Sequence, residues 1–198
     1  MSSETTRSSL LARLQGARDE QAWHEFEARY RDLVRRYCRR TGLQESDAED
    51  VAQAVFLALA RRLPTFQLEP ARGRFRDYLG RVVTNTIHRL HSSPTERVQL
   101  VGADILAEVV DPTEILEPGW EDEWMSHHLR VALRKVRAQA TPETMAIFER
   151  LLAGESVEDV ARTTDHTPDS IYKVKQRIGE RLHAEVEQQL LDEDLPSA

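Results

Sequence analysis

The sequence predicts an all-α fold of two small helical domains joined by an acidic linker, with a helix-turn-helix in the second domain. Apolar residues recur at intervals of three and four in most segments, and strict alternation of apolar and polar residues is absent. Gly and Pro number only eight each in 198 residues, and 40% of the residues are hydrophobic, which is enough for packed cores. These observations favour helices throughout the chain.

The first domain is expected over residues 1–93. A short helix is predicted around residues 10–14, and a longer one begins near Trp23 and ends where Gly42 can adopt the left-handed conformation. Cys38 lies on the apolar face of this longer helix and is the only cysteine, so an internal disulfide is excluded. A small buried apolar side chain is favoured there over a catalytic thiol.

The next helix is predicted to begin at a capping box. In the segment SDAE, the Ser46 side chain can accept from the third backbone amide while Glu49 reaches back. Its apolar residues are Val51, Val55, Phe56 and Leu59. The Leu63-Pro64 pair then ends the helix, because a residue before proline disfavours the helical conformation.

Basic residues gather on the following helix, Gly73 to His91, although the whole chain has a formal net charge of -7. At about 100° per residue, two neighbouring stripes form on this helix. The apolar stripe contains Phe75, Leu79, Val82, Thr86 and Leu90. The polar stripe contains Arg74, Tyr78, Arg81, Asn85 and His88. The first stripe is suited to a core and the second to a partner.

Residues 94–124 are predicted to form an acidic linker. Three prolines interrupt this stretch, and it lacks sustained helical periodicity. Arg97 is the only Lys or Arg from Arg97 to Met125. The excess acid collects in Asp104, Glu108, Asp111, Glu114, Glu117, Glu121, Asp122 and Glu123. The net negative charge of the chain therefore conceals two basic segments elsewhere.

The second domain is expected over residues 125–191, followed by a tail of residues 192–198. Three helix starts are predicted in quick succession, at Thr141-Pro142, Ser156 and Thr167-Pro168. Each offers an N-cap hydroxyl, and two of them place proline at the first helical position. This second domain is therefore also helical.

The last two helices have the proportions of a helix-turn-helix, with a short helix over residues 156–162, a turn over 163–166 and a longer helix after it. The turn contains Asp165, which tolerates the left-handed conformation better than most residues other than Gly. The apolar stripe of the longer helix consists of Ile171, Val174, Ile178 and Leu182.

This apolar stripe turns Asp169, Lys173 and Gln176 outward, with Tyr172 and Arg177 beside them. Cations at these positions can neutralise phosphates, while Lys173 and Gln176 can reach base edges in a major groove. The alternative is an ordinary antiparallel helix pair with a solvated charged face.

Three motifs in one order resemble those of a known family. DAEDVAQAVFLAL, residues 47–59, is followed by GRFRDYLGRVVTN, residues 73–85, and then by the helix-turn-helix. Together they resemble the bacterial sigma factors of the extracytoplasmic function group. The resemblance implies a first domain similar to region 2, which binds core RNA polymerase and opens the minus-ten promoter element. It implies a second domain similar to region 4, which recognises the minus-thirty-five element.

The resemblance and the residue chemistry together give candidate contact residues. Asp47, Asp50 and Gln53 form a polar face that would dock on the polymerase, although the acids also suit the positive end of the helix dipole. Candidates for the melted minus-ten strand are Arg74, Tyr78, Arg81, Asn85, His88 and Arg89. Candidates for the minus-thirty-five element are Thr167, Asp169, Ser170, Tyr172, Lys173, Gln176 and Arg177. Several family members carry Trp where this chain has Tyr78, whose ring either contacts a base or packs at the rim of the core.

Enzyme chemistry has little support, and neither a metal nor another cofactor is expected. His127 and His128 are adjacent, so on a helix they point about 100° apart and cannot both ligate one metal. No apolar run approaches the roughly 20 residues of a membrane span, and MSSETTRSSL lacks the features of a signal peptide. A cytoplasmic protein without membrane insertion is therefore expected.

The expected partners are core RNA polymerase and promoter DNA, with an anti-sigma protein as a further candidate. Two other functions stay open on the sequence alone. One is a helix-turn-helix regulator that binds operators without the polymerase. The other is a helical interaction protein that does not bind DNA.

Overall fold

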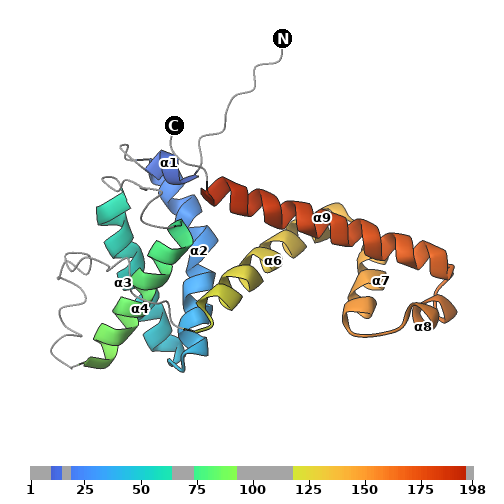
Figure 1. Cartoon of the computed structure of the whole chain (residues 1–198), viewed down its shortest axis with the longest axis horizontal. Coiled ribbons are helices and arrows are strands. Elements are labelled where there is room, and N and C mark those ends of the chain that lie inside the picture. The colour runs from blue at the N-terminus through green and yellow to red at the C-terminus, as the bar shows by residue number, and fades with distance from the viewer. Residues whose placement is uncertain (1–9, 15–18, 64–73, 93–117, 195–198) are drawn as a thin grey trace, which may run out of the picture. The chain divides into compact units, whose positions relative to one another are not determined.

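The structure is a computed structural model that describes residues 10–14, 19–63, 74–92 and 118–194. Every regular element in these residues is a helix, so the predicted all-α fold is confirmed. In chain order the helices are α1 (Leu10–Leu14), α2 (Glu20–Arg40), α3 (Glu45–Arg62), α4 (Phe75–Ser92), α6 (Trp120–Gln139), α7 (Pro142–Leu152), α8 (Val157–Arg162) and α9 (Pro168–Asp194) (Figure 1).

The chain divides into two compact units whose limits differ from the expected domains. One unit comprises Met1–Met125 together with Asp192–Ala198, and the other comprises Ser126–Leu191. The expected tail thus belongs to the first unit, where Glu193 is 6% exposed and accepts a hydrogen bond from the Tyr30 hydroxyl at 2.5 Å. Residues 94–117 of the expected linker and residues 195–198 of the tail lie outside the described residues.

The core of the first unit is built on the apolar face of α2. Phe26, Tyr30 and Tyr37 lie on this face, and each is at most 1% exposed. Phe56 of α3 and Phe75 of α4 meet the Phe26 ring edge-on, with centroids 6.0 and 5.8 Å away. Helix α3 packs against both α2 and α4, as Figure 1 shows. The three helices therefore share one aromatic core.

Trp120 and Trp124 of α6 complete this core. The Trp124 ring stacks on Tyr30 at 5.9 Å, and the Trp120 ring meets Tyr37 edge-on at 5.0 Å. Both tryptophans are 1% exposed, and the Trp120 indole N–H donates to the carbonyl of Arg76 at 3.1 Å. Residues 120–124 of the expected linker thus lie in α6. Helical periodicity identifies an apolar face but not the element that covers it.

The carboxylates at the start of α6 form ion pairs within the first unit. Glu121 pairs with Arg76 at 2.6 Å. Arg40 lies 3.7 Å from Asp122 and 3.2 Å from Glu123. Three of the acids counted in the expected linker therefore pair with arginines of the preceding helices, and of these only Glu123 is buried, while Glu121 and Asp122 stay exposed.

Helix α2 starts earlier than expected and ends as expected. It begins at Glu20, three residues before Trp23, because the Asp19 carboxylate caps it by accepting from the Ala22 N–H at 2.8 Å. At the other end Gly42 has a φ of 97°, in the left-handed region. The backbone hydrogen bonds around it form a Schellman motif, so the predicted glycine stop is confirmed.

The predicted capping box at Ser46 is wrong. Helix α3 begins at Glu45, and the side chain of its N-cap residue Gln44 makes no cap hydrogen bond. Glu49, expected to reach back along its own helix, forms an ion pair with Arg35 of α2 at 3.0 Å. The Glu49 carboxylate, which the capping box required, is thus held by Arg35 of a different helix.

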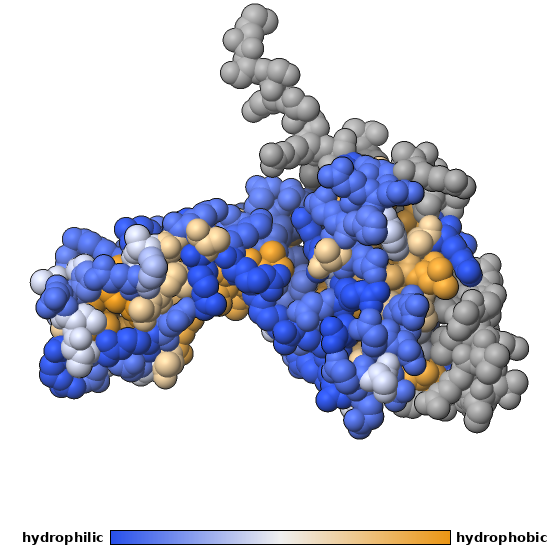
Figure 2. All heavy atoms as spheres, turned by 180° about the vertical axis from the view of Figure 1, so that it is seen from behind, coloured by the Kyte–Doolittle hydropathy of each residue, from blue (hydrophilic) through white to orange (hydrophobic). Residues whose placement is uncertain are grey.

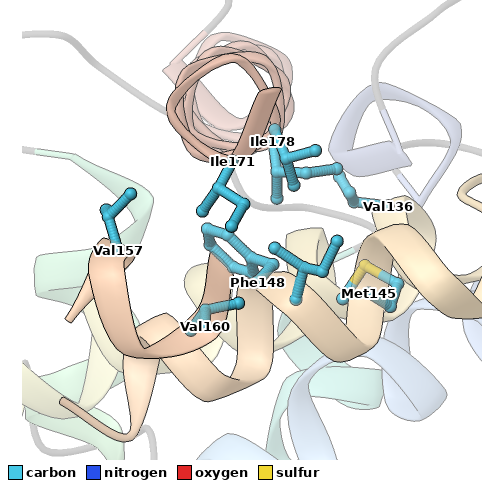
Figure 3. Close-up of a cluster of buried hydrophobic side chains, with 9 residues drawn as sticks. Val136, Met145, Phe148, Val157, Val160, Ile171 and Ile178 are labelled. Carbon is cyan, nitrogen blue, oxygen red and sulfur yellow. The ribbon is translucent and has the colours of Figure 1, made fainter. Parts of the chain in front are cut away.

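The second unit has an aliphatic core with one aromatic ring. The buried residues are Val136, Met145, Ile147, Phe148, Val157, Val160, Ile171, Val174 and Ile178, and Leu182 packs against them partly buried. Figure 3 shows Ile171 of α9 pointing toward Phe148 of α7. The apolar stripe predicted for the longer helix, from Ile171 to Leu182, therefore lies in or against the core.

The three helix starts predicted in the second unit are present. The hydroxyls of Thr141, Ser156 and Thr167 each accept a backbone N–H three residues ahead, at 3.3, 3.0 and 3.3 Å. The turn after α8 differs from expectation, because no described residue other than Gly has a positive φ, Asp165 included. Thr164 instead donates its hydroxyl to the Val160 carbonyl at 2.8 Å and satisfies the end of the helix.

Replacing Trp120 by alanine should destabilise the first unit by about 3–5 kcal/mol, because it removes a buried aromatic side chain and leaves a cavity. The measurement is the hydrogen-exchange protection of the α2 amides, which should fall. Met125→Ala truncates a 43% exposed side chain of the same helix and should leave the protection unchanged. Equal protection in both variants would show that α6 does not complete this core.

Candidate functional site

Asp47, Asp50 and Gln53, here called the α3 face, lie on the outer side of α3. Asp50 and Gln53 are exposed and Asp47 is half-buried. The opposite side of the helix, with Val51 and Val55, is buried in the core. The core therefore fixes the direction of the α3 face and leaves it accessible.

Sequence reasoning missed one neighbour of the α3 face. Leu57 is 39% exposed and lies four residues after Gln53, so it extends the same side of the helix by one turn. The spacing of seven from Asp50 was the signal that would have identified it. An apolar side chain beside exposed polar groups is typical of the centre of a protein interface.

The apolar stripe of α4 is buried as its spacing predicts. Phe75, Leu79, Val82, Thr86 and Leu90 are all at most 7% exposed. The hydroxyl of Thr86 donates to the Val82 carbonyl at 2.7 Å, which satisfies the polar atom on this face.

The polar stripe of α4, here called the α4 stripe, comprises Arg74, Tyr78, Arg81, Asn85 and His88. Arg74 and His88 are exposed, and Tyr78 and Asn85 are half-buried, as is the neighbouring Arg89. Arg81 departs from expectation because it is only 9% exposed. Val83 and Thr84 are also buried, so the buried sector of α4 is wider than its apolar stripe. The stem of an arginine can pack within such a sector, which helical spacing alone does not predict.

Tyr78 lies at the edge of this buried sector. Burial raises the pKa of its phenol to about 12, so the hydroxyl is neutral at physiological pH. A neutral, half-buried ring can contact a base without repelling the adjacent phosphates. The Tyr78 ring can therefore pack at the rim of the core and still contact a base.

Asp169, Tyr172, Lys173 and Gln176, here called the α9 stripe, are all exposed on the first half of α9. Lys173 Nζ lies 2.7 Å from Asp169 Oδ2, and this hydrogen bond raises the pKa of Lys173. The Gln176 amide donates to Glu180 at 2.8 Å. Three of the four side chains of the α9 stripe are thus engaged along their own helix, and Tyr172 is the exception.

The other candidate residues of α9 differ in their accessibility. Thr167 is exposed, but its hydroxyl caps the helix by accepting from the Ser170 N–H, and Ser170 is half-buried. Arg177 is exposed and forms no ion pair within the described part of the chain. Arg177 is therefore the most available cation among these candidates.

Arg150, which sequence reasoning missed, fixes the loop before α8 and the turn after it. Its guanidinium donates to both carboxylate oxygens of Glu155, with Nε 3.0 Å from each, and to the Thr163 hydroxyl at 2.7 Å. The partners lie five and thirteen residues away, at spacings that no helical pattern marks. This arginine joins the two segments that flank α8 and so stabilises the approach to α9.

The groups that could have indicated enzyme chemistry are buried. Cys38 is fully buried, and burial raises the pKa of its thiol to about 12. The rings of His127 and His128 are at most 2% exposed and meet edge-on at 5.4 Å. Within the described residues, no group of three or more His, Cys, Asp or Glu side chains could hold a metal ion.

The exposed surface is mainly hydrophilic. Figure 2 shows one face on which hydrophobic residues form small separate areas outside the grey parts. The large hydrophobic side chains exposed on the described residues are Leu57, Met125, Leu129, Leu152, Tyr172 and Leu191. None of the described helices combines the length and the apolar character that crossing a bilayer requires.

Residues 28–94 match the family model for sigma-70 region 2. The match runs from within α2 through α3 and α4, so it contains the α3 face and the α4 stripe. The match supports a domain similar to sigma-70 region 2 in this part of the chain. No curated protein and no solved structure gives a significant match to the chain. The α9 stripe lies outside the matched residues.

The thiol of Cys38 should react with Ellman's reagent far more slowly in the native protein at pH 8 than in concentrated urea. Burial both blocks access and keeps the thiolate population low, since the thiolate is the reactive form. The measurement is the rate of thionitrobenzoate release. Comparable rates in the two conditions would contradict the buried position of this side chain.

Proposed function

We propose that the chain is a sigma factor of the extracytoplasmic function type, which binds core RNA polymerase and directs promoter recognition, promoter melting and transcription initiation in the cytoplasm. The carrying observation is that the sigma-70 region 2 match ends with α4 and contains two polar surfaces of different charge, the exposed α3 face and the partly exposed α4 stripe. The α3 face is acidic, and the α4 stripe is basic. One surface thus suits a protein partner and the other a nucleic acid.

The α3 face, extended by Leu57, is the proposed polymerase contact. Asp50 and Gln53 place polar groups beside an exposed apolar side chain, a combination found at protein interfaces. The acidic charge would also speed association with a basic partner surface. Helix-dipole stabilisation explains an acid at Asp47, in the first turn, but it does not explain the exposed Gln53 and Leu57.

The α4 stripe is the proposed contact for the melted strand. Arg74, His88 and Arg89 supply positive or protonatable groups, Tyr78 a planar ring and Asn85 an amide that can both donate and accept. Because Arg81 is buried, we assign it a supporting role beneath this surface and not a direct contact. The helix α9 would then contact the upstream element, with Arg177 on phosphate.

Asp50→Arg should weaken binding to core RNA polymerase about 30-fold or more, which corresponds to about 2 kcal/mol at an interface centre. Binding is measured by fluorescence anisotropy of the labelled full chain, and circular dichroism checks that helical content is unchanged. Glu20→Arg makes a similar charge change at an exposed first-turn position of α2 and should bind normally. Undiminished binding of Asp50→Arg would overturn the polymerase contact.

The same polymerase preparation separates the alternative functions. A sigma factor gives transcription from selected promoters only with the core enzyme. A regulator that acts alone would bind a specific sequence without it, and an interaction protein would bind no DNA in either case. Either of these results would overturn the proposed function.

Asn85→Ala combined with His88→Ala should spare polymerase binding but reduce strand opening. The readout is permanganate reactivity of unpaired thymines near the start site, and the defect should shrink on a template that is already mismatched there. Arg81→Ala should mainly lower the stability of the first unit, because its side chain is buried. Normal opening by the double variant would remove the α4 stripe from the melting step.

A further inference from the structure

The position of Tyr172 on α9 has no explanation in the core of its unit. Ile171, Val174 and Ile178 supply the buried contacts of this part of the helix, while Tyr172 is 54% exposed. Tyr172 follows Asp169 by three residues and precedes Gln176 by four, so these side chains share one side of the helix. The ring therefore stands in the middle of the α9 stripe.

The polar side chains on either side of the ring are already paired. Asp169 holds Lys173 at 2.7 Å, and Glu180 accepts from Gln176 at 2.8 Å. The Asp169–Lys173 pair is neutral overall, and Asp169 itself repels phosphate. The paired side chains thus add no net attraction for a nucleic-acid backbone, whereas the exposed Lys175 and Arg177 provide such attraction nearby.

An exposed ring in this position fits one chemical group of the major groove. Donors and acceptors line the edges of the base pairs there, and the only apolar group is the C5-methyl of thymine. A tyrosine ring buries apolar area against such a methyl at little entropic cost, because it has few rotatable bonds. The ring and the methyl are therefore complementary where the flanking charges cancel.

We infer that Tyr172 determines specificity by contacting the C5-methyl group of a thymine in the upstream promoter element. This inference rests on the proposed function, since it requires α9 to lie in the major groove. The contact uses the ring and not the hydroxyl. Phenylalanine should therefore replace tyrosine without loss of thymine preference.

The test removes the methyl group without changing any hydrogen bond. The full chain is assembled with core RNA polymerase, and its preferred upstream element is selected from randomised duplexes. Each thymine of the selected element is then replaced by deoxyuridine in turn. For the parent protein, one replacement should weaken binding about fourfold, the change that corresponds to one buried methyl group.

The variants assign this effect to the ring. Tyr172→Ala should bind more weakly overall and show no further loss with deoxyuridine at that position, while Tyr172→Phe should keep the fourfold effect. Leu191→Ala is the matched control, because Leu191 is also 54% exposed on α9, and it should keep the effect as well.

The outcomes distinguish this inference from the proposed function. If the parent selects an element that contains no thymine, if deoxyuridine has no effect, or if its effect persists in Tyr172→Ala, the inference is overturned while the sigma-factor function stands. If the holoenzyme selects no element at all and gives no promoter-dependent transcription, both are overturned.

Discussion

The aromatic face of α2 is the constraint on which the first unit depends. Phe26, Tyr30 and Tyr37 present three large rings along one helix, and one neighbouring helix cannot cover them all. Helices α3 and α4 cover part of this face, and Trp120 and Trp124 cover the rest. The outward direction of the polar surfaces on α3 and α4 follows from this burial, because each helix turns its apolar side toward the same rings.

Local patterns in the sequence were sufficient wherever the deciding interaction was local. The stop at Gly42 depends on the backbone conformation of one residue, and the periodicity of α4 fixes its apolar side. The capping box predicted for α3 was wrong, and Glu49 pairs with an arginine of another helix. The burial of Arg81 and the packing of Trp120 in the core of the first unit were also missed. Each depends on neighbouring helices whose positions the sequence alone does not give.

The candidate surfaces also combine properties that local spacing predicts with properties that depend on distant residues. The accessibility of Asp50, Gln53 and Tyr172 follows from helical spacing, since each lies opposite a buried stripe. Charge was harder to assess from the sequence. The arginines of α2 are largely engaged by glutamates, for example Arg35 by Glu49, so they contribute less to nucleic-acid attraction than their number suggests.

The hydrogen bond from Tyr30 to Glu193 links residues 163 positions apart inside one unit. A ribosome makes α2 long before it makes the end of α9, so this contact forms only after nearly all the described residues have been synthesised. Contacts of such sequence separation form slowly because a long loop must close first. The unit that is translated first is therefore the last to gain all of its contacts, although its aromatic face can be covered as soon as Trp124 has been made.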